Sequence, residues 1–293
     1  MVEVVARAVV ILAVGAVALM ALSALSLAYA THPVRYVSRA TPADLGWPFE
    51  RVSLQTEDGL TLSAWHIPAL INTPGHPTVI VLHGYPYDKG NVLGVTQFLH
   101  RDFDLLLFDF RYFGESEGSF TSVGYHERLD LVAALDYARS RGARSIGVWG
   151  FSMGAAVALL AVPEAEGVDA IVADSAYAHL DGMVMDYYRG FPLADRALAL
   201  CTGILSRVFL GIWPSDVSPL RAAAGAQLPI LVIHGAEDRT IPRDHFEDMR
   251  AALAGNPAAR FWLVEGSSHG LTYATASKAY ERIVLEFFRA HLG

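Results

Sequence analysis

Short apolar runs recur along the chain and alternate with longer segments of helical periodicity. Runs that are apolar throughout are typical of strands buried on both faces of a sheet. Ahead of them, residues 49–68 alternate apolar and polar positions around Glu57-Asp58-Gly59, which predicts a β-hairpin. The apolar runs that predict buried strands lie at 77–84, 103–110, 145–150, 169–174, 229–235 and 260–266.

Helical patterns separate these runs, and one insertion interrupts the alternation. Strand–helix alternation after a hairpin predicts an α/β fold with about eight strands, mostly parallel, and helices on both faces of the sheet. The apolar, aromatic segment 183–213 lies in a long stretch between two strands and predicts a helical cap at about 175–228. We expect its aromatic side chains mainly to pack, and as a second possibility to line an apolar pocket or touch a bilayer. The helical patterns lie at 91–101, 122–142, 152–161, 245–255 and 276–292.

The first 30 residues form a separate piece of the chain. Residues 8–30 contain no charged side chain, and a helix of about 20 apolar residues crosses a bilayer. We therefore expect a retained single-pass transmembrane anchor at 1–30, a linker at 31–48 and an α/β domain at 49–293. The alternative is a cleaved signal peptide and a secreted protein, since Ala28-Tyr29-Ala30 fits a small-x-small cleavage site. Basic residues on both sides of the span leave open on which side of the membrane the α/β domain lies.

Composition and charge exclude several classes of function. The chain has 293 residues, a formal net charge of −8 and a pI of about 5.7, without a basic cluster, which argues against a nucleic-acid partner. Cys201 is the only cysteine, so an intrachain disulfide and a cysteine-based metal site are both excluded. The sequence has no P-loop, no dinucleotide-binding fingerprint and no H-E-x-x-H motif. It carries no signal for an oligomeric state.

Polar residues directly follow several of the predicted strands. Active sites of open parallel sheets lie beyond the carboxyl ends of the strands, so these residues are expected to meet. In chain order, three of them are a hydroxyl, a carboxylate and an imidazole: Ser152, Asp238 and His269. Such a set can act as nucleophile, orienting acid and general base. The other strand ends carry His83-Gly84-Tyr85 and Asp174-Ser175.

These motifs resemble those of the α/β-hydrolase fold family. The serine lies in Gly150-Phe151-Ser152-Met153-Gly154, a G-x-S-x-G sequence at a strand-to-helix turn, and the acid and histidine follow in the family's order. The resemblance runs from about Phe49 to the C-terminus and includes "IHGAEDRTIP" (233–242) and "DFRYFGESEG" (109–118). Within the family, the chain is similar to esterases, lipases, thioesterases and serine-peptidase-like members.

The resemblance implies a role for each site residue. Ser152 is the expected nucleophile, His269 the general base and Asp238 the acid that orients the histidine. The backbone N–H groups of Met153 and Tyr85 are the expected oxyanion donors. The reaction is hydrolysis of a carboxylic ester, thioester or amide through an acyl-enzyme, on a small or lipid-like acyl substrate. It needs neither a metal ion nor an organic cofactor.

Alternatives remain at the level of the site and of the function. Asp174 is a rival for the acid, since some family members carry it after that strand; as a structural residue it is an N-cap for the cap. His83 is expected to brace the oxyanion loop, and Glu115 and Glu117 to be solvated loop charges. A serine peptidase is the alternative enzyme, although no charged anchor for a peptide terminus is evident. A non-enzymatic binding protein of the same fold is the alternative from another class.

Overall fold

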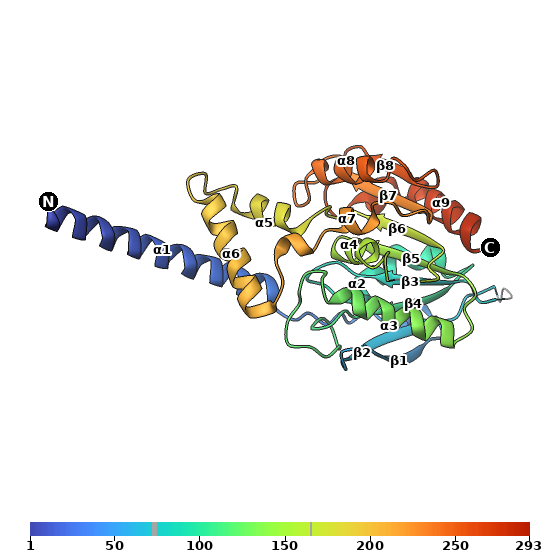
Figure 1. The fold of residues 1–293 in the computed structure, drawn as a ribbon. Helices are drawn as coiled ribbons and strands as arrows, with labels where there is room; N and C mark the ends of the chain where they lie inside the picture. Colours follow the sequence, from blue (N-terminus) through green and yellow to red (C-terminus); the bar gives the residue numbers. More distant parts are fainter. Residues whose placement is uncertain (72–74, 165) are drawn as a thin grey trace. The chain divides into compact units, whose positions relative to one another are not determined.

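The computed structural model describes residues 1–71, 75–164 and 166–293, and it divides them into two compact units (Figure 1). One unit contains Val34–Ala178 and Ser218–Gly293 and holds the sheet. The other contains Met1–Pro33 and His179–Val217 and is helical. The helical part that interrupts the sheet unit, residues 179–217, is called the cap segment below.

The sheet has eight strands in the order β1-β2-β4-β3-β5-β6-β7-β8. β2 pairs antiparallel with both β1 and β4, and every other pairing is parallel. This arrangement confirms the predicted fold class and the predicted hairpin. The strands are β1 (Glu50–Gln55), β2 (Thr61–Ile67), β3 (Thr78–Leu82), β4 (Asp104–Phe108), β5 (Ile146–Phe151), β6 (Ala170–Asp174), β7 (Ile230–Gly235) and β8 (Arg260–Val264).

Helices cover both faces of this sheet, and each face has its own apolar core. Strand β3 shows why: Ile80 and Leu82 point into the core under α3, α4 and α8, while Val79 and Val81 point into the core under α2 and α9. A strand buried on both faces has to be apolar at every position, which is what the sequence pattern records. The helices of this unit are α2 (Lys89–Thr96), α3 (Glu127–Ser140), α4 (Met153–Leu160), α7 (Pro219–Ala223), α8 (Arg243–Ala252) and α9 (Thr272–Leu292), with 3-10 turns at Pro42–Leu45 and Gln97–Leu99.

The second unit consists of α1 (Val2–Thr31), α5 (Leu180–Tyr188), α6 (Asp195–Leu210) and a 3-10 turn, Pro214–Asp216. Among the described residues, one helix is long and apolar enough to cross a membrane by itself, and this helix is α1. Most of its surface is exposed. The aromatic side chains of the cap segment do not mainly pack, which corrects the expectation from sequence. Tyr188 is buried, whereas Tyr187, Phe191 and Phe209 are exposed.

Candidate active site

Ser152 occupies a strained turn between β5 and α4. Its φ is +53°, a left-handed conformation that a serine rarely adopts, and its N–H donates to the Asp174 carbonyl at 2.8 Å. Gly154 allows this turn to lie against the end of β3. A Cβ at Gly154 would be 2.6 Å from the carbonyl oxygens of His83 and Leu82, closer than van der Waals contact permits. The second glycine of the G-x-S-x-G sequence, Gly154, is therefore required by the packing of α4 on β3.

The structure brings the other two predicted residues to this turn. The Nε2 atom of His269 lies 3.0 Å from Ser152 Oγ, and its Nδ1 atom lies 2.6 Å from Asp238 Oδ2. The imidazole ring also packs against the Phe151 ring, with 5.2 Å between the ring centroids. A hydroxyl, an imidazole and a carboxylate thus form a continuous hydrogen-bonded chain.

The turn after β7 holds the Asp238 carboxylate in place. Its Oδ1 atom accepts hydrogen bonds from the backbone N–H groups of Thr240 and Ile241, at 2.9 and 2.8 Å. Its side chain is fully buried, so Oδ2 is directed at His269 without competition from water. Nearby, His234 Nε2 donates to the Ile241 carbonyl at 2.9 Å, as expected for a packed residue of the strand.

Asp174, the rival for the acid, has a different set of partners. Its Oδ2 atom accepts from Thr272 Oγ1 at 2.6 Å and from Tyr280 OH at 2.8 Å, and its Oδ1 atom accepts from Ser175 Oγ at 2.9 Å. Complete burial raises the pKa of this carboxyl, although the three hydroxyl donors oppose the shift. Asp174 therefore ties β6 to α9 and does not orient His269.

The loop after β3 lies against the turn at Ser152, which is called the elbow below. An oxyanion donor is expected in this loop. A Cβ at Gly84 would meet Phe151 Cδ1 at 2.8 Å and Ser152 Cβ at 3.3 Å, so only a glycine permits this approach. His83 braces the loop as predicted: its Nε2 atom accepts from the Phe110 N–H at 3.0 Å, and its Nδ1 donates to the Gly84 carbonyl at 3.0 Å. Burial lowers the pKa of His83, which keeps the ring neutral and able to accept.

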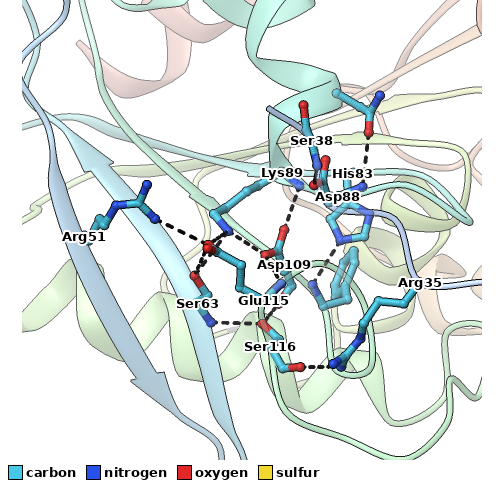
Figure 2. A network of polar contacts seen from close by, with 12 residues as sticks. Arg35, Ser38, Arg51, Ser63, His83, Asp88, Lys89, Asp109, Glu115 and Ser116 are labelled. Carbon is cyan, nitrogen blue, oxygen red and sulfur yellow. Dashed lines mark hydrogen bonds and ion pairs between the residues drawn. The ribbon is translucent and has the colours of Figure 1, made fainter. Parts of the chain in front are cut away.

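A buried lysine holds the far end of the same loop (Figure 2). Lys89 Nζ lies 2.5 Å from Asp109 Oδ2, 2.9 Å from Glu115 Oε2 and 3.1 Å from Ser63 Oγ. Asp109 also accepts from the Lys89 N–H at 2.8 Å, and it is fully buried. The start of α2 is thereby fixed to the loop after β4. Glu115 is exposed, as expected of a solvated loop charge, and it also takes part in this network.

The segment that follows α1 is attached to the same network (Figure 2). The Ser38 N–H donates to Asp88 Oδ2, one residue before α2. Arg35 donates to two backbone carbonyls of the loop after β4, those of Tyr112 at 2.6 Å and Ser116 at 2.5 Å. Sequence reasoning missed these contacts because they join residues separated by 50 to 81 positions. No local motif signals such pairings.

A cavity of about 340 Å³ opens beside the constellation. Gly84, Tyr85 and His269 line the side nearest the elbow, and the rest of the lining includes Val92, Trp149 and Tyr273. Its size falls at the lower end of the range for small-molecule sites, and its lining is mostly apolar and aromatic. The cavity therefore suits a small acyl compound.

Comparison with known proteins places this site in a family. The sequence profile of the alpha/beta hydrolase fold matches residues 77–200, a range that includes Ser152. The chain is 30% identical over 246 residues to the uncharacterised protein YqkD of Bacillus subtilis, covering 78% of this chain and 75% of that protein. The chain belongs to the alpha/beta hydrolase fold family.

Solved structures and other relatives of this alpha/beta hydrolase extend the comparison. The Pyrococcus furiosus esterase Pf2001 superimposes with a TM-score of 0.74 at 29% identity, over 89% of this chain and 100% of the esterase. The uncharacterised membrane protein YNL320W of Saccharomyces cerevisiae is 26% identical over 247 residues, covering 80% of this chain and 81% of the yeast protein. The likeness to both relatives extends over most of this chain.

Proposed function

We propose that this alpha/beta hydrolase is a serine esterase that hydrolyses small carboxylic esters through an acyl-enzyme. The observation that carries the proposal is the chain of contacts from Ser152 Oγ to His269 Nε2, at 3.0 Å, and from His269 Nδ1 to Asp238 Oδ2, at 2.6 Å. The first distance allows the proton transfer between serine and histidine that nucleophilic catalysis needs, and the second lets the carboxylate orient and stabilise the imidazole. The likeness to an esterase at 29% identity supports the same reaction class.

In the acylation step, Ser152 Oγ attacks the ester carbonyl carbon and its proton passes to His269 Nε2. The negative charge that develops on the carbonyl oxygen lies beside the N–H groups of Met153, at the start of α4, and of Tyr85. The C–O bond to the leaving group then breaks, and His269 returns the proton to the departing alkoxide. Asp238 stabilises the imidazolium formed between these two transfers.

In the deacylation step, a water molecule replaces the alcohol. His269 Nε2 takes one proton from the water as its oxygen attacks the acyl carbon, and the same two N–H groups hold the oxyanion. The bond to Ser152 Oγ breaks, the serine recovers the proton from His269, and a carboxylic acid leaves. Thioesters and amides can follow the same steps, with a thiol or an amine as leaving group.

We further propose that α1 attaches the enzyme to a membrane as a single-pass anchor. Its 30 residues exceed the roughly 20 that a bilayer span requires, and from Ala8 to Ala30 it has no charged side chain and is mostly exposed. A relative whose name describes it as a membrane protein supports this assignment. In this proposal the enzyme keeps residues 1–30, and it is not a secreted product of signal cleavage.

A substrate panel tests the reaction class. p-Nitrophenyl esters of graded acyl length and aminoacyl p-nitroanilides are offered to the full chain in detergent and to the Ser152→Ala variant. We expect the wild type to prefer short acyl esters, which fit the 340 Å³ cavity. A preference for an aminoacyl amide over every ester would contradict the esterase assignment and favour a peptidase.

A further inference from the structure

Helix α6 of the cap segment exposes four large apolar side chains. Leu200, Ile204, Val208 and Phe209 are 59%, 39%, 69% and 72% exposed. The buried residues of this helix are two leucines and three small residues: Leu198, Thr202, Gly203, Leu205 and Ser206. No charged residue occurs between Ala197 and Ser206. A helix on the surface of a water-soluble protein carries polar and charged residues on its exposed side.

The buried polar groups of this helix all have partners inside the same unit. Thr202 Oγ1 lies 2.8 Å from Tyr188 OH, and Ser206 Oγ donates to the Ile212 carbonyl at 2.7 Å. Satisfied small polar residues between helices, with bulky apolar residues outside, are the arrangement found in membranes.

Helix α1 packs against α6 and extends the same apolar surface. The buried hydroxyl of Ser23, near the middle of the apolar stretch of α1, donates to the Leu198 carbonyl of α6 at 3.0 Å. The other sides of α1 expose Val14, Val17 and Leu25. Because the two helices are packed together, a bilayer that surrounds α1 also reaches the outer face of α6.

The ends of α6 define how deeply it can insert. Its 16 residues are about 24 Å long, less than the roughly 30 Å of a bilayer's hydrocarbon core. Exposed Phe191 lies just before it and partly exposed Trp213 just after it, and such aromatic residues favour the membrane interface. Arg196 and Arg207 are exposed near its two ends, where long side chains can reach the headgroups.

From these observations we infer that the outer face of α6 inserts into the lipid bilayer beside α1 without spanning it. The partner is the acyl-chain region of a membrane. The inference rests on the proposed anchoring through α1 and is independent of the proposed triad. The cap segment is then a second membrane-embedded part of the protein, in addition to the single transmembrane anchor that the sequence predicts at 1–30.

Fluorescence quenching in vesicles tests this inference on the full chain. In a Cys201→Ser background, single-cysteine variants Leu200→Cys and Val208→Cys carry an environment-sensitive dye on the outer face of α6. Val14→Cys marks the anchor, and Ser140→Cys, exposed at the end of α3, marks water. The proteins are reconstituted into phosphatidylcholine–phosphatidylglycerol vesicles. Quenching by doxyl-labelled acyl chains is then compared with quenching by aqueous iodide.

We expect the dyes at positions 200 and 208 to lose most of their fluorescence to the doxyl chains, as the dye at 14 does, and little to iodide. Quenching of the α6 dyes by iodide, with lipid quenching at 14 intact, would overturn the inference and leave the anchor standing. Protection from both quenchers would also overturn it, because another protein surface, such as a second copy, would cover the face. Absence of lipid quenching at every position would overturn the anchor and the inference together.

Discussion

Asp238 and His269 lie 31 residues apart in the chain, yet Asp238 Oδ2 is 2.6 Å from His269 Nδ1. They follow β7 and β8, which pair in parallel, so their turns meet at one edge of the sheet. The two backbone N–H groups that bind Oδ1 of Asp238 leave Oδ2 free to orient the imidazole. This relationship, more than the local sequence around either residue, defines which carboxylate serves the histidine.

Replacing the two candidate acids separately distinguishes them. Asp238→Asn should reduce kcat by about 10⁴-fold, the scale for loss of an orienting carboxylate. Asp174→Asn should reduce kcat by less than about tenfold, because it changes only hydrogen bonds to three hydroxyls, each of about 1 kcal/mol. Steady-state hydrolysis of a short p-nitrophenyl ester measures both. Equal losses would mean that Asp174 also takes part in catalysis.

The packing of the elbow predicts a steric effect at Gly154. Gly154→Ala places a methyl group 2.6 Å from two strand carbonyl oxygens, so the turn must move, and a shift near 1 Å at the nucleophile costs about 100-fold in kcat/KM. Gly94→Ala is the matched control, since nothing lies within 4 Å of its Cβ position. This control should keep full activity and gain up to about 1 kcal/mol of stability. Retained activity in Gly154→Ala would show that the elbow tolerates displacement.

The polar network beside the loop after β3 predicts unequal effects for two of its cations, Lys89 and Arg35. Lys89→Met leaves the fully buried Asp109 without its counter-charge, which should lower the free energy of unfolding by about 3 kcal/mol. Arg35→Ala removes an exposed side chain and should cost less than about 1 kcal/mol. Thermal unfolding in detergent compares the two variants. Similar melting temperatures for the two variants would mean that a buried Asp109 without its counter-charge does not destabilise the fold by the expected amount.

Buried neutral histidines predict loss of stability on mild acidification. Burial lowers the pKa of His234 below the value of about 6.5 expected for the unfolded chain. As the pH falls below 6.5, the unfolded chain takes up the proton first, so stability present above pH 6.5 is lost, by up to about 1.4 kcal/mol per pH unit for each such histidine. His234→Phe should reduce this slope. Phe246→Leu, beside it, should lower stability at every pH without changing the slope.

Much of the sheet was predictable because a strand that is buried on both faces needs an apolar residue at nearly every position. The run around Ile80 is apolar throughout since alternate side chains enter two separate cores. The turn residues Ser152, Asp238 and His269 could be aligned because parallel strands end at a common edge. Their distances could not be predicted, since these depend on turns such as the one that binds Asp238 Oδ1.

Contacts between distant segments were not predictable from local pattern. No local motif singles out Lys89, and only the fold brings Asp109 and Glu115 to it. The cap segment shows a similar limit. Its apolar content is evident in the sequence, but which face of α6 is buried depends on α1, more than a hundred residues away. Tyr187, Phe191 and Phe209, which were expected to pack, are therefore exposed.

The measurement that tests the central claim most directly is labelling by a fluorophosphonate probe, which reacts with an activated serine. The account predicts that the full-length wild type becomes labelled at Ser152, that Ser152→Ala is not labelled, and that His269→Gln labels far more slowly. Loss of the nucleophile should also reduce kcat by about 10⁶-fold. A wild type that stays unlabelled while folded, or a Ser152→Ala variant that still labels, would contradict the assignment of Ser152 as the nucleophile.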